Sequence, residues 1–218
     1  MSAAASSADR LRTNEAPPRS ARALEVLLTT IDNYDAYTGG HSERVAGYAG
    51  EIARLLGYSF ATVNLVRRAA YVHDIGKIFI PETIVQKPGD LTIEEQAVVR
   101  KHPELGARML EKRPGMRELA PIVLHHHERW DGKGYPTGLR GAAIPVESRI
   151  IFVADAFDAM TSERPYGRVM TRREAAAELH RCSGKDFDPQ VVRAMRLALN
   201  SGSLDEASKG RVALVATA

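Results

Sequence analysis

Residues 60–77 read FATVNLVRRAAYVHDIGK, and this stretch joins a helical hydrophobic pattern to a histidine–aspartate pair. Val63, Val66 and Ala70 recur at spacings of three and four residues, which places them on one face of an α-helix. Gly76 is expected to end the helix, because glycine is typical of helix C-termini. The pattern predicts a helix over 60–74 that carries an imidazole and a carboxylate at its C-terminal end.

Helical signals continue on both sides of this stretch. Apolar residues follow one helix face over 24–31 and again over 45–56. Thr92 and Thr171 are each followed by a glutamate three residues later, the pattern of a capping box at a helix N-terminus. Further helices are expected over the ranges 104–113, 117–128, 146–162 and 189–199. The segment RVALVAT, at 211–217, is ambiguous between a strand and a flexible tail, and no strand pattern recurs. The sequence therefore predicts an all-α bundle.

The composition is that of a globular protein. The 218 residues suit one domain, and 44% apolar with 26% charged residues exclude a disordered chain. The net charge of +3 fits an anionic substrate but is too small to indicate nucleic-acid binding. The single cysteine, Cys182, excludes an internal disulfide and fits a reducing compartment.

The expected boundaries follow from local composition. Residues 1–19 have no hydrophobic period and are expected to form a flexible tail, with the folded domain over 20–200 and a C-terminal tail over 201–218. The start of the chain lacks an apolar segment, and no run of about 18 apolar residues occurs. A cytoplasmic protein without a membrane span is expected.

Six of the seven histidines lie at or near expected helix ends or breaks. They are His41, His73, His102 and the triplet His125, His126 and His127. With Asp74 and Asp155, they offer imidazole and carboxylate donors from five separate segments. This donor set suits iron, manganese, zinc or nickel, whereas calcium and magnesium prefer oxygen alone. Because no thiolate joins the set, a structural zinc site is not expected.

Asp74 indicates how many ions the site holds. A carboxylate can bridge two cations about 3.5 to 4 Å apart, and the adjacent His73 can bind one of them. Asp155 lies in an otherwise apolar helix, where a buried carboxylate needs a compensating cation. The residues therefore favour a binuclear centre.

Each of these signals alone also has a structural explanation. A histidine–aspartate dipeptide is common, His102 before Pro103 is typical of a helix end, and a histidine triplet suits a solvated turn. Five segments that each offer a donor of the same chemical class at a helix end favour the metal centre.

Four motifs then resemble a known family. HDIGKIFIP (73–81), KHPELG (101–106), HHERWDGKGYPTGL (126–139) and RIIFVADAFDAMTSERPYG (149–167) closely resemble the HD-GYP proteins, a bacterial branch of the HD phosphohydrolases that hydrolyse cyclic di-GMP. The resemblance covers roughly 25–197. It implies a single HD-type bundle of about seven helices with a metal pocket between them. It also implies the metal ligands His41, His73, Asp74, His102, His126, His127 and Asp155, with Asp74 bridging.

The activity implied by the resemblance is hydrolysis of cyclic di-GMP to pGpG, with GMP as a further product. A metal-bridging hydroxide would attack phosphorus while two divalent ions neutralise the developing charge. Iron or manganese is expected first, with zinc or nickel as alternatives. Competing interpretations are hydrolysis of another cyclic dinucleotide such as cyclic GMP-AMP, and a binding module that acts through the GYP loop.

Three basic residues are expected to hold the substrate. Lys77 is placed to direct its charge at the phosphate and is also assigned a catalytic role, while Arg164 would form a bidentate fork. Two departures from the family pattern matter. Tyr37 stands where some members have the glutamate that binds a third metal, which predicts two ions. Gly167 stands where many members have a basic residue, so either Arg168 replaces that residue or the affinity for substrate is reduced.

The GYP loop is the remaining feature. Gly132 and Gly134 permit a sharp turn, and Tyr135 is expected to be an exposed aromatic next to Pro136. The resemblance implies contacts between this loop and diguanylate cyclase (GGDEF) proteins. His125 precedes the family's histidine pair and is expected to face solvent or support the ligands.

Overall fold

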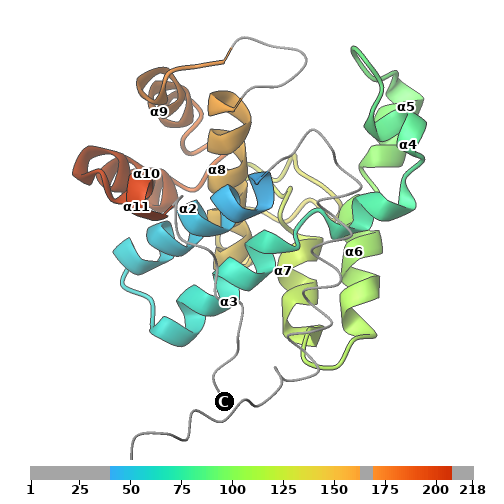
Figure 1. Ribbon diagram of the computed structural model, residues 1–218, viewed down its shortest axis with the longest axis horizontal. Coiled ribbons are helices and arrows are strands. Elements are labelled where there is room, and N and C mark those ends of the chain that lie inside the picture. Colours follow the sequence, from blue (N-terminus) through green and yellow to red (C-terminus); the bar gives the residue numbers. More distant parts are fainter. Residues whose placement is uncertain (1–39, 163–168, 208–218) are drawn as a thin grey trace, which may run out of the picture.

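The computed structural model describes residues 40–162 and 169–207, and its regular elements in these ranges are helices (Figure 1). The α-helices are α2 (His41–Leu55), α3 (Phe60–Tyr71), α4 (Glu82–Val85), α5 (Ile93–Val99), α6 (His102–Glu111), α7 (Ala120–Leu124), α8 (Val146–Thr161), α9 (Arg172–Arg181), α10 (Pro189–Ser201) and α11 (Ser203–Ala207). Short 3-10 helices are η1 (Ile75–Phe79), η2 (Arg117–Leu119) and η3 (Gly141–Ala143). The predicted all-α class is confirmed.

Helix α8 is the centre of the bundle because it is apolar on most of its surface. It contacts α2 and α3 on one side, α9 and α10 on another, and α7 on a third. Phe157 of α8 is completely buried and meets Tyr48 of α2 edge to face, with ring centroids 5.5 Å apart. Figure 1 shows α9 and α10 on the opposite side of α8 from α6.

Both capping boxes form as predicted. The Glu95 backbone N–H donates to the Thr92 hydroxyl, and the Glu95 carboxylate accepts from the Thr92 N–H at 2.7 Å. Thr171 and Glu174 form the same pair at the start of α9. These reciprocal bonds satisfy N–H groups that have no partner within the helix.

Helix α3 ends at Tyr71 rather than near Gly76, so that part of the prediction is wrong. The Nδ1–H of His73 donates to the Ala70 carbonyl at 2.6 Å, and this carbonyl is the one that would accept the Asp74 N–H if the α-helix continued. The backbone continues instead into η1. Gly76 is needed for another reason, because a Cβ there would lie 1.9 Å from the carbonyl oxygen of His102.

The helix expected over 117–128 is also shorter. It is η2 followed by α7, and it ends at Leu124, so the histidine triplet lies beyond the helix in a turn. The Nδ1–H of His126 donates to the Val123 carbonyl at 2.6 Å and removes it from the helical pattern. The helix end is therefore set by a side chain that the hydrophobic period does not reveal.

The folded part continues past the expected boundary at residue 200. Helix α11 contacts α2 and α10, and Leu204 is completely buried against the core. The helix expected over 24–31 and the ambiguous segment 211–217 lie outside the described residues. No helix in the described ranges has both the length and the apolar character to cross a bilayer.

Candidate metal centre

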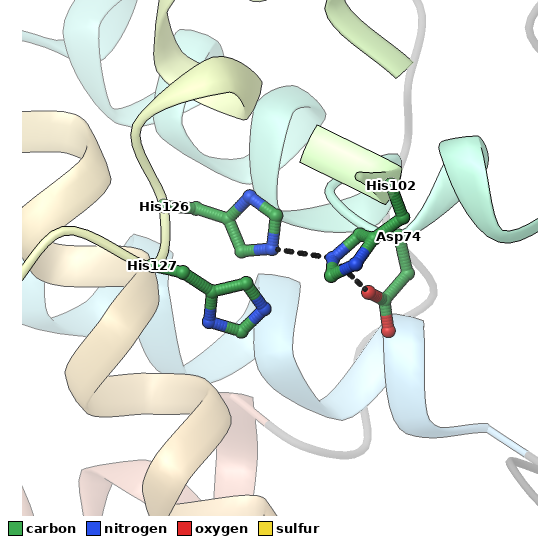
Figure 2. A group of neighbouring side chains, drawn as sticks. All are labelled: Asp74, His102, His126 and His127. Carbon is green, nitrogen blue, oxygen red and sulfur yellow. Dashed lines mark hydrogen bonds and ion pairs between the residues drawn. The ribbon is translucent and has the colours of Figure 1, made fainter. Parts of the chain in front are cut away.

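All seven predicted ligands meet in one place between the helices, as two groups of side chains. Asp74, His102, His126 and His127 form one group, and His41, His73 and Asp155 form the other. Within each group the ligand atoms lie within 4.8 Å of one another. Figure 2 shows the three rings of the first group turned toward the Asp74 carboxylate.

Three of the rings are held by the same backbone contact. His73, His102 and His126 each donate Nδ1–H to the carbonyl three residues earlier, at 2.6, 2.8 and 2.6 Å. In each case that carbonyl lies in the last turn of a helix: α3, α5 or α7. Because Nδ1 carries the proton, Nε2 presents its lone pair to the centre, which is the tautomer that a metal ion requires.

His41 is held by a carboxylate instead. Its Nδ1 lies 2.7 Å from Asp158 Oδ2, and Arg44 donates to the same carboxylate at 2.6 and 3.0 Å. Asp158 is 1% exposed. Burial raises the pKa of Asp158, but the bonds from His41 and Arg44 outweigh burial and lower it to about 2. Asp158 is therefore an ionised support for His41, and the sequence analysis missed it.

The two oxygens of Asp74 face different groups of ligands. Oδ1 lies 3.2 Å from Nε2 of His102, whereas Oδ2 lies 3.4 Å from Nε2 of His73 and 4.0 Å from Nε2 of His41. His41 Nε2 also lies 3.5 Å from Asp155 Oδ1, which completes the second group. This division is the geometry expected of a carboxylate that bridges two cations.

The donor set fits a divalent metal ion. Nε2 of His73 is buried and has no hydrogen-bond partner in the described part of the chain. Nε2 of His126 points at Nε2 of His102 across 3.2 Å, so two lone pairs face one another unless a proton or a cation lies between them. Buried polar atoms seldom remain unpaired, and a cation would satisfy these atoms together.

The electrostatics favour the metal-binding forms of His126, His127 and Asp74, but not of His73. Burial and repulsion from other imidazoles, first among them His127, hold the pKa of His126 well below its ordinary value, and burial together with His102 lowers the pKa of His127 to about 3. Burial opposes ionisation of Asp74, but Lys77 and His73 outweigh it and hold its pKa well below the ordinary value. Burial lowers the pKa of His73, whereas Asp74 and Asp155 raise it to about 9 overall. Without metal, the carboxylates of Asp74 and Asp155 therefore favour a protonated His73, and a metal ion at Nε2 would replace that proton.

Lys77 lies beside the ligands. Its Nζ is 2.6 Å from Asp74 Oδ2, so its charge is directed into the centre. Arg164, Arg168 and Tyr37 lie outside the described residues. His125 does not join the ligand groups: its Nδ1 lies 3.4 Å from the Thr137 hydroxyl and 3.7 Å from the Glu128 carboxylate.

The GYP loop is attached to the centre rather than turned away from it. Tyr135 is partly buried and stacks on the ring of His127, with centroids 4.9 Å apart, so the expectation of an exposed aromatic is wrong. Glu128, 1% exposed, accepts from the N–H and hydroxyl of Thr137 at 2.8 and 2.7 Å and from the Gly138 N–H at 3.1 Å. Gly134 is required here, because a Cβ would lie 2.3 Å from the Arg129 nitrogen.

Residues 25–191 match the sequence pattern of the HD domain family. The chain belongs to this family, in its HD-GYP branch. It is 42% identical over 184 residues to a cyclic di-GMP phosphodiesterase response regulator of Xanthomonas campestris, covering 84% of this chain and 49% of that protein. It is 44% identical over 173 residues to a cyclic di-GMP phosphodiesterase of Thermotoga maritima, covering 78% and 47%.

A third curated relative has a different named substrate. The HD-GYP chain is 40% identical over 181 residues to a 3'3'-cGAMP-specific phosphodiesterase of Vibrio cholerae, covering 81% of this chain and 39% of the relative. The chain thus spans about half the length, or less, of the curated relatives described here.

Solved structures share the fold. A cyclic GMP-AMP specific phosphodiesterase of V. cholerae superposes with a TM-score of 0.66 at 19% identity, covering 86% of this chain and 51% of that one. The HD domain of a Listeria monocytogenes phosphodiesterase in complex with cyclic-di-AMP superposes with a TM-score of 0.58 at 19% identity, covering 83% and 97%.

Proposed function

We propose that the chain is a metal-dependent phosphodiesterase that hydrolyses cyclic di-GMP to pGpG and, in a further step, to GMP. The observation that carries this proposal is the pair of ligand groups that share the Asp74 carboxylate. The named activity of the relatives from X. campestris and T. maritima gives the substrate. The second candidate substrate is cyclic GMP-AMP, because the V. cholerae relative at 40% identity is named for it.

Two divalent ions would be held by the seven ligands, with iron or manganese favoured and zinc or nickel as alternatives. When bound, such a pair supplies a water of lowered pKa and positive charge for the phosphate oxygens. The chain's own residues would hold these two ions. Asp74 offers one oxygen to each group, while the backbone carbonyls and Asp158 fix the orientation of the imidazoles.

Basic side chains would neutralise the phosphodiester. In this proposal the Lys77 ammonium, 2.6 Å from Asp74 Oδ2, would direct its charge at a phosphate oxygen bound at the centre. Arg164 and Arg168 are proposed to bind the phosphates from the segment that follows α8. A guanidinium can pair with two phosphate oxygens at once, so either residue suits this role.

The GYP loop is proposed as a contact for diguanylate cyclase proteins. The Tyr135 ring stacks on His127, so the exposed side chains of Lys133 and Thr137 are the ones that a partner would contact. A cytoplasmic location is proposed as well, because it would place the enzyme with an intracellular nucleotide messenger.

The test is metal content and product analysis on the same anaerobically purified sample. We expect about two metal equivalents and the appearance of pGpG from cyclic di-GMP. Asp74→Ala should lose at least one ion and all hydrolysis. Asp90→Ala removes an exposed carboxylate and should keep the wild-type metal content and activity.

Other results would redirect or remove the proposal. Hydrolysis of cyclic GMP-AMP in place of cyclic di-GMP would establish the second candidate. A protein that takes up no metal after reconstitution and hydrolyses neither nucleotide would be a binding module. Full metal content and activity in Asp74→Ala would refute the bridging role.

A further inference from the structure

A cavity lies between α9 and α10. It is open to solvent and has a volume of about 490 Å³, which is within the range of about 300 to 1,000 Å³ typical of small-molecule sites. Its lining comes from α9 and α10 and includes none of the seven metal ligands. Figure 1 places these two helices away from α6, on the other side of α8. The cavity is therefore separate from the metal centre.

The cavity is lined by positive charge. Arg172, Arg173 and His180 project from α9, and Arg196 comes from α10, with no carboxylate in the lining. Arg172 forms an ion pair with Asp205 of α11, which offsets part of that charge. Arg173 and Arg196 have no carboxylate partner within residues 40–162 and 169–207. Their guanidinium groups are therefore available to an anionic ligand in the cavity.

The remainder of the lining is small and apolar. Ala176 lies one turn after Arg172 on α9, and the half-buried Leu199 lies three residues after Arg196 on α10. A ligand that fills the cavity would meet guanidinium groups as well as an apolar surface. Guanidinium forks match phosphate oxygens in geometry and charge, and an apolar surface suits a nucleobase or a similar flat group.

We propose that the α9–α10 cavity is a non-catalytic binding site for a phosphate ester of nucleotide size. The phosphate is held by Arg173 and Arg196, and the apolar part of the ligand rests against Ala176 and Leu199. The proposal is independent of the reaction at the metal centre.

The experiment is calorimetric titration of the metal-free 218-residue chain at low salt with GMP as the probe. Binding is expected for the wild type and for Asp74→Ala, because that change leaves the cavity intact. The double variant Arg173→Ala/Arg196→Ala should bind GMP at least about tenfold more weakly, since each lost charge-assisted bond lowers affinity by about that factor. Arg193→Ala is the matched control, because Arg193 is an exposed arginine of α10 outside the cavity lining.

Several results would overturn the proposal. They are the absence of GMP binding at millimolar concentration, equal loss in the Arg193→Ala control, loss with Asp74→Ala but not with the cavity variant, and equal binding of guanosine. Equal affinity for inorganic phosphate would overturn it too, because the apolar part of the cavity would then contribute nothing. Both arginines are exposed, so the double variant is expected to fold. Its circular dichroism spectrum checks that a loss of GMP binding is not caused by unfolding.

Discussion

At the scale of single residues, Gly76 holds two backbones in contact. A Cβ on Gly76 would lie 1.9 Å from the His102 carbonyl oxygen and 2.6 Å from the Gly106 nitrogen. Both obstacles are backbone atoms, so the side chains nearby cannot relieve the overlap. Because Asp74 precedes Gly76 and His102 begins α6, this contact also sets the distance between a carboxylate and an imidazole of the metal centre.

Gly76→Ala is predicted to destabilise the protein by about 1 to 3 kcal/mol, the usual cost of overpacking, or more because backbone must move. Urea unfolding of the metal-free protein measures it. Gly106→Ala is the graded control, because its nearest new contact is the Ile75 side chain at 3.1 Å and alanine improves helix propensity by about 1 kcal/mol. Equal stability of the two variants would contradict the close approach.

Asp158 is the second residue whose role can be isolated. Asp158→Asn keeps the size of the side chain but removes the charge that orients His41 and pairs with Arg44. Loss of such a support is predicted to weaken metal binding about 10- to 100-fold. A chelator competition with Mn²⁺ gives the affinity. Asp188→Asn is the control, because that buried carboxylate pairs with Arg149 and caps α10 without contacting a ligand, so it should lower stability and leave metal affinity unchanged.

At the scale of elements, the sequence predicted what depends on local pattern. The all-α class, both capping boxes and the apolar helix α8 follow from periodicity and capping residues. The ends of α3 and α7 were missed, because imidazoles of His73 and His126 take carbonyls that would otherwise extend the helix. The seven candidate ligands were chosen from donor type and motif, and the structure brings them together. Their supports depend on contacts such as the pairing of Asp158 with His41, 117 residues away, which no local pattern encodes.

The GYP loop is predicted to hold a metal ligand in place through Tyr135. Its ring stacks on His127, and Arg100 lies over the Tyr135 ring at 5.3 Å. Aromatic pairs contribute about 0.5 to 1.5 kcal/mol, so Tyr135→Ala should weaken metal binding by about 2- to 12-fold, whereas Tyr135→Phe should keep wild-type affinity. Chelator competition with Mn²⁺ measures these affinities. Equal affinity in the wild type, Tyr135→Ala and Tyr135→Phe would show that the loop does not hold the ligand.

At the scale of the whole molecule, the metal centre connects elements that are distant in sequence. Its candidate ligands come from α2, from the turn after α3, from α6, from the turn after α7 and from α8. Unfolding any of these elements removes at least one ligand. Metal binding should therefore stabilise the described fold as one unit, since a ligand that binds only the folded state shifts the unfolding equilibrium.

Removal of metal is predicted to lower the melting temperature. A ligand at 100 times its dissociation constant raises the free energy of unfolding by about 2.7 kcal/mol. In a chain of this size each kcal/mol raises the melting temperature by about 2 to 4 °C. Adding Mn²⁺ to the chelator-treated protein should therefore raise its melting temperature by roughly 5 to 10 °C. Asp74→Ala should show a smaller shift, because one carboxylate serves both ligand groups. Calorimetry also tests whether the described fold unfolds as one unit. A single transition that moves as a whole with Mn²⁺ would support this. A metal-sensitive transition together with a metal-insensitive one would show that α9, α10 and α11 unfold independently of the centre.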